Sequence, residues 1–291
     1  MSSPLSRRTF LAGTAVLAAA AACGKGKPKV IDTTTDSTTS AANALNLIVA
    51  TFDPVAGLDQ RLAFAVLKDQ EPLPKSEAQV MIELVAQGGG YGPPAPAVRH
   101  DDGIEHRPFW ELTTKFTKPG VWQARVQHGG ETATAAFEVL DPAAVSAPIP
   151  GRALLSTPTP TLAATQGVTP ICTRQPACPW HTVSLDQALR ASKPVVVLFG
   201  TPARCESQTC GPVLDILLGE KDAFEAKGVQ FIHVEIYKDL QTQVHVPAVD
   251  AYKLSGDPVL FTAGANGVVV ERVNGPFDRA DAKAFLGKLV A

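Results

Sequence analysis

The stretch that decides the fold runs from Val195 to Leu217 and reads VVVLFGTPARCESQTCGPVLDIL. Its first five residues are apolar without alternation, which is typical of a strand buried on both faces. A short loop with Cys205 and Cys210 follows, and CGPVLDIL then begins a helix. The C-x4-C spacing is two residues longer than the redox C-x-x-C pattern and fits no common zinc knuckle. Three interpretations fit: a reactive thiol pair, a structural disulfide or half of a metal site.

The first 23 residues have the pattern of an export signal. Arg7 and Arg8 precede Thr-Phe-Leu, and the alanine-rich apolar run 11–22 is too short to cross a membrane comfortably. This pattern resembles a twin-arginine signal. The segment ending at Cys23 resembles a bacterial lipobox, with Ala20 where leucine is usual. We therefore predict export and lipid anchoring through Cys23 to a bacterial membrane; the alternative is an ordinary cleaved signal in which Cys23 has no role.

Four cysteines remain once Cys23 is set aside: Cys172, Cys178, Cys205 and Cys210. An even number in an exported chain favours disulfides, and four thiols allow three pairings. Proximity along the chain favours Cys172–Cys178 and Cys205–Cys210. The 26 Lys and Arg residues nearly balance the 28 Asp and Glu residues, and no basic block follows the signal. Nothing in the charge pattern therefore points to nucleic acid.

Composition divides the rest of the chain into four segments. Residues 24–44 are small and polar and predict a flexible tether. Residues 45–141 contain six or seven short runs with period-two character, as in VWQARV, and predict an all-β, immunoglobulin-like sandwich. Residues 142–180 are rich in proline, alanine and threonine and predict an interdomain linker carrying the first cysteine pair. Residues 181–291 alternate between helical and strand patterns.

The last segment has the order helix, strand, helix, strand, hairpin, helix. An Asn266–Gly267 pair marks the hairpin turn, and Asp278 is suited to cap the final helix. The order, the strand KPVVVLFGTPARC, the helix start CGPVLDIL and the sequence GDPVLF together resemble the thioredoxin family over 181–291. GDPVLF, with Asp257–Pro258 opening a strand, is similar to the family's cis-proline loop. The resemblance implies an α/β thioredoxin-like domain after the sandwich.

The resemblance also implies thiol–disulfide exchange with other exported proteins, although whether the chain is an enzyme stays open. Matching CGPV to the family's C-G-P-C makes Cys210 the nucleophile, because the first turn of a helix lowers a thiol pKa. Cys205 would then resolve the mixed disulfide, and Pro258 would shape the substrate groove. Counting from the strand end at Phe199 instead places Cys205 at the nucleophile position. Leu198 stands where thioredoxins have a buried aspartate, which puts efficient proton transfer in doubt.

Two other functions are compatible with the sequence. One is a non-catalytic binding or scaffold lipoprotein in which both disulfides only stiffen the fold. The other resembles the Sco family of copper carriers, with Cys205, Cys210 and His245 as ligands of a soft ion; the favoured interpretation needs no cofactor. We interpret Cys172–Cys178 as a loop staple, or alternatively as a disulfide that exchanges with the second pair. No role is assigned to the histidines of the sandwich: His100, His106 and His128.

Overall fold

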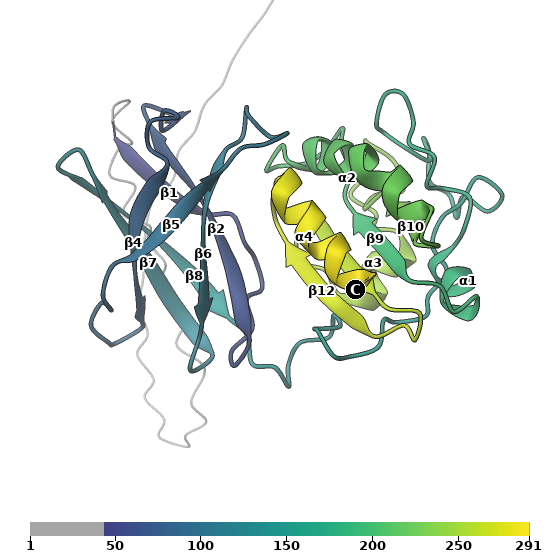
Figure 1. Cartoon of the computed structure of the whole chain (residues 1–291), viewed down its shortest axis with the longest axis horizontal. Coiled ribbons are helices and arrows are strands. Elements are labelled where there is room, and N and C mark those ends of the chain that lie inside the picture. Colours follow the sequence, from purple (N-terminus) through teal and green to yellow (C-terminus); the bar gives the residue numbers. More distant parts are fainter. Residues whose placement is uncertain (1–43, 291) are drawn as a thin grey trace, which may run out of the picture. The chain divides into compact units, whose positions relative to one another are not determined.

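The computed structural model describes residues 44–290 (Figure 1). The predicted signal with Arg7 and Arg8, the predicted lipidation at Cys23 and the predicted tether up to residue 43 lie outside the described residues. Within 44–290, no helix has both the length and the apolar character that a membrane span requires.

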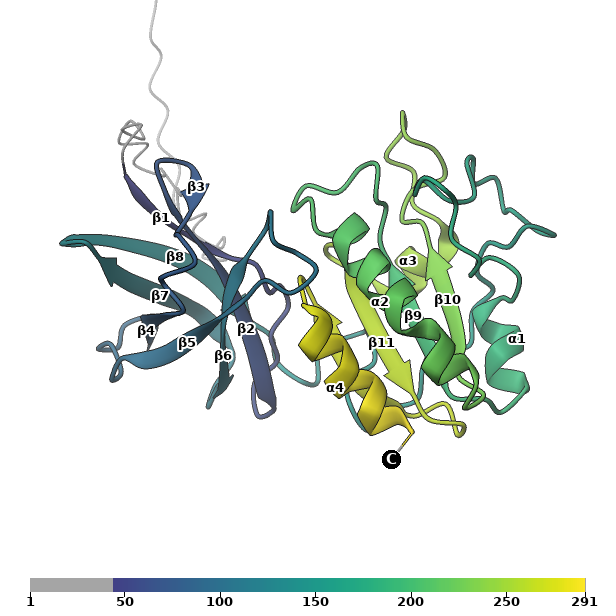
Figure 2. The same cartoon turned by 45° about the horizontal axis from the view of Figure 1, so that its top comes forward.

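The N-terminal region is one antiparallel sheet with the strand order β1-β2-β6-β5-β4-β7-β8, and the short β3 pairs with β2. The backbone N–H of Leu45 on the first strand donates to the Glu131 carboxylate on the last, 3.0 Å away, so the sheet curls toward closure. This confirms the all-β prediction at the level of a sandwich- or barrel-like sheet (Figure 2). The strands are β1 (Leu45–Val49), β2 (Asp59–Lys68), β3 (Glu71–Pro72), β4 (Gln79–Ala86), β5 (Ala95–His100), β6 (Phe109–Lys115), β7 (Gly120–His128) and β8 (Glu131–Val139).

Strand β7 shows why this sequence forms a half-buried sheet. Ala124 and Val126 are buried in the core of the N-terminal region, and Trp122 packs against that core from the same face. Alternate residues of a strand point to opposite faces, so period-two sequence produces one apolar face. The turn to β8 is made by Gly129 and Gly130, whose φ angles of 58° and 82° favour glycine.

The C-terminal region has a four-stranded sheet in the order β10-β9-β11-β12. Strands β9 and β10 are parallel, and β11 is antiparallel to both of its neighbours. The predicted elements occur in the predicted order, with the short helix α3 added; its six residues begin at Pro247 and are too few for a helical period. The elements are α1 (Leu185–Arg190), β9 (Val195–Phe199), α2 (Cys210–Glu225), β10 (Gln230–Val234), α3 (Pro247–Tyr252), β11 (Val259–Ala263), β12 (Val269–Asn274) and α4 (Arg279–Leu289).

Both faces of this sheet are covered by helices. On β9, Val196 and Leu198 join the core shared with α2 and α4, which lie on one face of the sheet (Figures 1 and 2). The alternate residues Val195, Val197 and Phe199 join the core shared with α1 and α3. All five are at most 1% exposed, which explains the uninterrupted apolar run.

The segment 142–180, predicted to be a linker, contains no helix or strand and packs closely against the C-terminal region. The N–H of Leu154 donates to the Gly267 carbonyl at 2.9 Å. Trp180 stacks on Phe231 of β10, with ring centroids 4.8 Å apart. The segment therefore behaves as part of the C-terminal core, while the exact domain boundaries stay a prediction.

Candidate functional site

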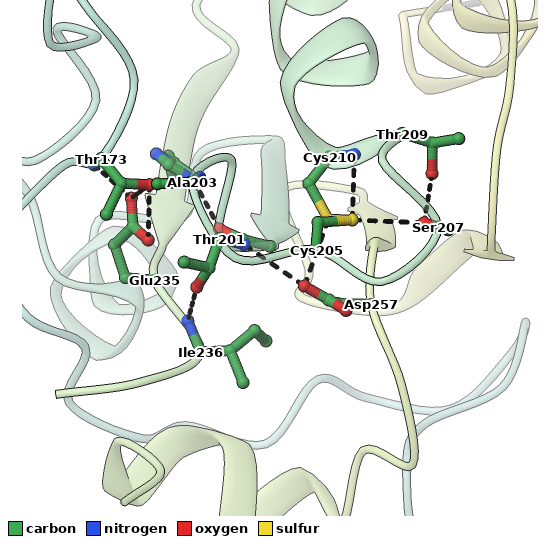
Figure 3. The surroundings of a disulfide bond; sticks show 12 residues. Thr173, Thr201, Ala203, Cys205, Ser207, Thr209, Cys210, Glu235, Ile236 and Asp257 are labelled. Carbon is green, nitrogen blue, oxygen red and sulfur yellow. Dashed lines mark hydrogen bonds between the residues drawn. A yellow bond between two sulfur atoms is a disulfide. The ribbon is translucent and has the colours of Figure 1, made fainter. Parts of the chain in front are cut away.

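A disulfide joins Cys205 and Cys210 where β9 passes through a loop into α2 (Figure 3). This confirms the predicted pairing of these two cysteines. Cys210 is the first residue of α2, and its backbone N–H lies 3.3 Å from the Cys205 sulfur. The Cys205 sulfur therefore lies at a helix N-terminus, where unpaired N–H groups and the helix dipole stabilise negative charge on sulfur.

The two sulfurs differ in their exposure. Cys210 is only 1% exposed, whereas Cys205 is half-buried beside the exposed residues Glu206 and Ser207. The Ser207 hydroxyl lies 3.2 Å from the Cys205 sulfur. A second molecule can therefore reach Cys205 but not Cys210 without movement of the loop.

Asp257 supplies a carboxylate to the buried side of the disulfide (Figure 3). Its Oδ2 lies 3.1 Å from the Cys210 sulfur and accepts a hydrogen bond from the Thr201 backbone N–H at 3.3 Å. Burial raises the pKa of the Asp257 carboxyl to about 6, although the Thr201 hydrogen bond opposes this shift. A carboxyl with this pKa can gain or lose a proton near neutral pH beside the buried sulfur.

The carboxylate near the disulfide does not lie at the position of Leu198. Leu198 is buried in the apolar core, so β9 contributes no carboxylate to the site. The carboxylate comes instead from the residue before Pro258, and the Asp257–Pro258 peptide bond is cis. Pro258 itself is buried, whereas Gly256 and Asp257 are half-buried and Ser255 is the exposed residue of this loop. The sequence marked the loop, but nothing in its pattern indicated that Asp257 would face the sulfur.

A hydrogen-bond network holds the loop before Cys205 (Figure 3). The buried Glu235 carboxylate accepts from the Thr173 N–H at 2.7 Å, and the Thr173 hydroxyl accepts from the Ala203 N–H at 3.1 Å. The Thr201 hydroxyl accepts from the Ile236 N–H at 2.9 Å. Burial raises the pKa of Glu235. The segment 142–180 thus fixes one side of the disulfide loop.

A groove of about 600 Å³ lies beside the disulfide loop. Ile48, half exposed, and Phe52 contribute apolar surface to it. Loop residues Ser207 and Thr209 and the carboxylate-bearing Asp257 contribute its polar side. The groove therefore presents both apolar and polar surface next to the accessible sulfur.

The predicted Cys172–Cys178 disulfide is not formed in the structure. Both cysteines are free and buried, and their sulfurs face two histidines instead. The Cys178 sulfur lies 3.2 Å from Nε2 of His181 and 3.4 Å from Nδ1 of His233; the Cys172 sulfur lies 3.8 Å from the same Nδ1. Spacing alone suggested a staple, whereas the fold surrounds each thiol with imidazole.

These neighbours change the ionisation of the two thiols. A hydrogen bond from the Cys178 thiol holds the pKa of Cys172 far below its ordinary value. Hydrogen bonds to His181 and His233 lower this pKa further, by smaller amounts. The hydrogen bond to Cys172 and burial raise the pKa of Cys178.

The alternative copper site, with Cys205, Cys210 and His245 as ligands, is not assembled. Nδ1 of His245 lies 3.2 Å from Asp250 Oδ1 on α3. Among the described residues, Asp257 rather than His245 brings a ligand atom close to the Cys205–Cys210 sulfurs. A further cluster, unassigned from the sequence, joins His100 to Glu111 and Asp281.

The family model described as the TAT (twin-arginine translocation) pathway signal sequence matches residues 4–23. The chain therefore carries a twin-arginine signal, which indicates export across the membrane and confirms the predicted export signal. None of the curated proteins matches the chain.

Three solved structures show partial likeness. A crystal structure of an engineered protein is 17% identical, with a TM-score of 0.24, and the match covers 35% of this chain and 20% of that one. The Titin M10–Obscurin like 1 Ig complex is 20% identical, with a TM-score of 0.21, over 34% of this chain and 98% of that one. A mutant of that complex is 21% identical, with a TM-score of 0.19, over 34% and 90%. At these TM-scores the likenesses identify no function.

Proposed function

We propose that this chain is an exported thiol–disulfide exchange protein whose redox couple is Cys205–Cys210. The observation that carries the proposal is the disulfide at the start of α2, with a buried carboxyl of Asp257 beside the inner sulfur. The mixed sheet flanked by helices and the cis-proline loop facing the disulfide support a thioredoxin-like assignment for the C-terminal region. A reactive pair and a shifted carboxyl at a strand-to-helix junction are typical of functional sites.

We assign the roles of the two cysteines by exposure, which reverses the assignment favoured from the sequence. Cys205 is accessible and its sulfur lies near the helix N-terminus, so it forms the bond to the substrate. Cys210 is 1% exposed and next to Asp257, so it is the resolving cysteine and Asp257 its proton acceptor. A thiolate, not a thiol, is the attacking species, so the buried Cys210 requires such a base.

The exchange proceeds in two balanced steps. A substrate thiolate attacks the Cys205 sulfur, the Cys205–Cys210 bond breaks, and its electron pair stays on Cys210, which takes a proton from the Asp257 carboxyl or from water. A second substrate thiolate then attacks the substrate sulfur of the mixed disulfide and releases Cys205. The substrate dithiol becomes a disulfide and the protein disulfide becomes a dithiol; the reverse steps reduce a substrate disulfide.

The groove beside the disulfide supports a protein substrate. Its apolar side, with Ile48 and Phe52, can bind side chains of a peptide segment that passes Cys205. We also propose that lipid attachment at Cys23 keeps the protein at the membrane after export. Mass spectrometry of the mature N-terminus tests this part separately, since an unmodified Cys23 or cleavage elsewhere contradicts it.

A matched pair of single variants tests the exchange. Cys210→Ser leaves the accessible Cys205 thiol and should accumulate mixed disulfides with exported proteins, which reducing agent releases on a gel. Cys205→Ser removes the accessible sulfur and should accumulate none. Equal trapping by both variants contradicts the proposed roles. A disulfide that dithiothreitol reduces only on unfolding contradicts exchange itself and favours the non-catalytic scaffold.

A further inference from the structure

We propose that Cys172, Cys178, His181 and His233 form a structural zinc site, separate from the disulfide. The four side chains offer two sulfur and two nitrogen ligand atoms, all within 4.8 Å of one another. Each of the four residues is buried, with Cys178, at 6%, the most exposed. A set of two thiolates and two imidazoles is one of the standard closed zinc sites in proteins.

The distances between ligand atoms fit a tetrahedral ion. With Zn–S bonds of about 2.3 Å and Zn–N bonds of about 2.0–2.1 Å, tetrahedral angles place sulfur and nitrogen ligands about 3.6 Å apart. Three of the four sulfur–nitrogen distances in this cluster are 3.2, 3.4 and 3.8 Å, which lie on both sides of that value. Each of these three ligand pairs therefore lies within a few tenths of an ångström of the separation that binding the ion requires.

The surroundings of His233 fix which ring nitrogen faces the cluster. Nε2 of His233 lies 2.9 Å from the Gly200 carbonyl, which can only accept a hydrogen bond, so Nε2 carries the proton. Nδ1 then presents a lone pair toward both sulfurs. A metal-binding histidine generally donates its other N–H to a carbonyl or carboxylate in this way. The backbone N–H of Cys178 also points to the Cys172 sulfur at 3.4 Å, as suits a thiolate.

The charge of the two thiolates and the mixture of sulfur and nitrogen ligands favour zinc over other ions. Two thiolates balance the charge of Zn²⁺, so the buried site carries no net charge, whereas isolated buried charges are costly. Tetrahedral coordination by two sulfur and two nitrogen atoms is typical of zinc, and four protein ligands leave no open position for catalysis. The ion would therefore hold the chain around residues 172–181 against β10 and the disulfide loop.

The first experiment measures metal in the full chain. The protein is purified without chelators from cells supplied with zinc, and mass spectrometry should find close to one zinc per chain. Cys178→Ser and His181→Ala should each lower this ratio at least tenfold. His245→Ala and Cys205→Ser/Cys210→Ser remove similar side chains outside the cluster and should keep one zinc. Zinc retained by both cluster variants, or lost in both controls, overturns the proposal.

A second measurement does not depend on the folding of a variant. The unaltered chain is reduced, freed of metal and titrated with Co²⁺, which should give the intense visible bands of a tetrahedral ion and a thiolate-to-cobalt charge-transfer band. Zinc should then displace the colour. A folded, reduced chain that binds neither ion overturns the proposal. So does a chain whose Co²⁺ spectrum lacks the charge-transfer band. Neither result bears on exchange at Cys205.

Discussion

Two cysteine pairs with nearly equal spacing lie in very different surroundings. Cys205 and Cys210 are separated by four residues and Cys172 and Cys178 by five. The first pair is disulfide-bonded at a helix N-terminus beside one carboxylate, and one of its sulfurs is accessible. The second pair is free, buried and faces two imidazoles. The difference indicates that the neighbours brought by the fold, and not the spacing, decide the chemistry of each pair.

The two sites are also mechanically connected. His233 faces the buried pair through Nδ1, and its Nε2 contacts the Gly200 carbonyl at the beginning of the disulfide loop. Thr173, next to Cys172, accepts a hydrogen bond from Ala203 in the same loop. The buried cluster therefore supports the loop that carries the accessible sulfur. A stable Cys172–Cys178 cluster is a condition for a well-placed Cys205–Cys210 disulfide.

The largest expected effect is measured with two matched double variants, which compare how each cysteine pair contributes to stability and to exchange. Cys205→Ala/Cys210→Ala should abolish exchange and lower the free energy of unfolding by about 2 kcal/mol, the loop-closure entropy of so short a loop. Cys172→Ala/Cys178→Ala should lower it by more than that, because metal ligation contributes directly to folding free energy. Urea unfolding and reaction with a chromogenic aromatic disulfide measure the two properties. A larger loss of unfolding free energy in Cys205→Ala/Cys210→Ala than in Cys172→Ala/Cys178→Ala contradicts a metal-binding role for the buried pair.

Much of the fold could be predicted from local sequence. The apolar run of β9, the alternation in β7 and the Asn266–Gly267 turn each report one local physical requirement, and each is confirmed. Helix α3 was missed because six residues give no readable period. The packing of 142–180 was missed because proline and alanine also occur in loops that are held by tertiary contacts.

The candidate site was predictable only in part. The Cys205–Cys210 pair could be predicted because both residues lie on one short loop. The histidine cluster could not, because His233 follows Cys178 by 55 positions and only the packing of segment 172–181 on β10 brings them together. Asp257 likewise approaches Cys210 across 47 positions. Contacts between distant segments depend on the tertiary fold. The spacing of residues along the sequence does not predict them.

The next largest effect concerns the Asp257 carboxylate, which only the Cys205–Cys210 pair has beside it. Asp257→Asn should slow resolution of a mixed disulfide on Cys205 by about 100-fold at pH 7, the lower end of general-base contributions. The reduced protein reacts with the chromogenic disulfide in two phases: attack by Cys205 and then attack by Cys210. Only the second phase should slow. Equal slowing of both phases contradicts a base at Cys210 and indicates a general change in the loop.

The pH dependence gives an independent test of the same carboxylate. Burial raises the pKa of Asp257 to about 6, so it is mostly protonated below pH 5 and ionised above pH 7. A proton acceptor must be ionised, so the second phase should accelerate as the pH rises through about 6 and then level off. Asp257→Asn should lack this rise. Glu206→Gln, a control that removes an exposed carboxylate from the same loop, should keep it.

The smallest effect concerns the hydroxyl beside the accessible sulfur. Ser207 Oγ lies 3.2 Å from the Cys205 sulfur, where it can donate a hydrogen bond to a thiolate. Ser207→Ala removes this hydrogen bond to the attacking sulfur and should slow the first phase about threefold at neutral pH. Gln208→Ala truncates the neighbouring exposed side chain, which contacts Arg107 rather than sulfur, and should leave the rate unchanged. Equal slowing in both variants would assign the effect to loop mobility and contradict a role for the Ser207 hydroxyl.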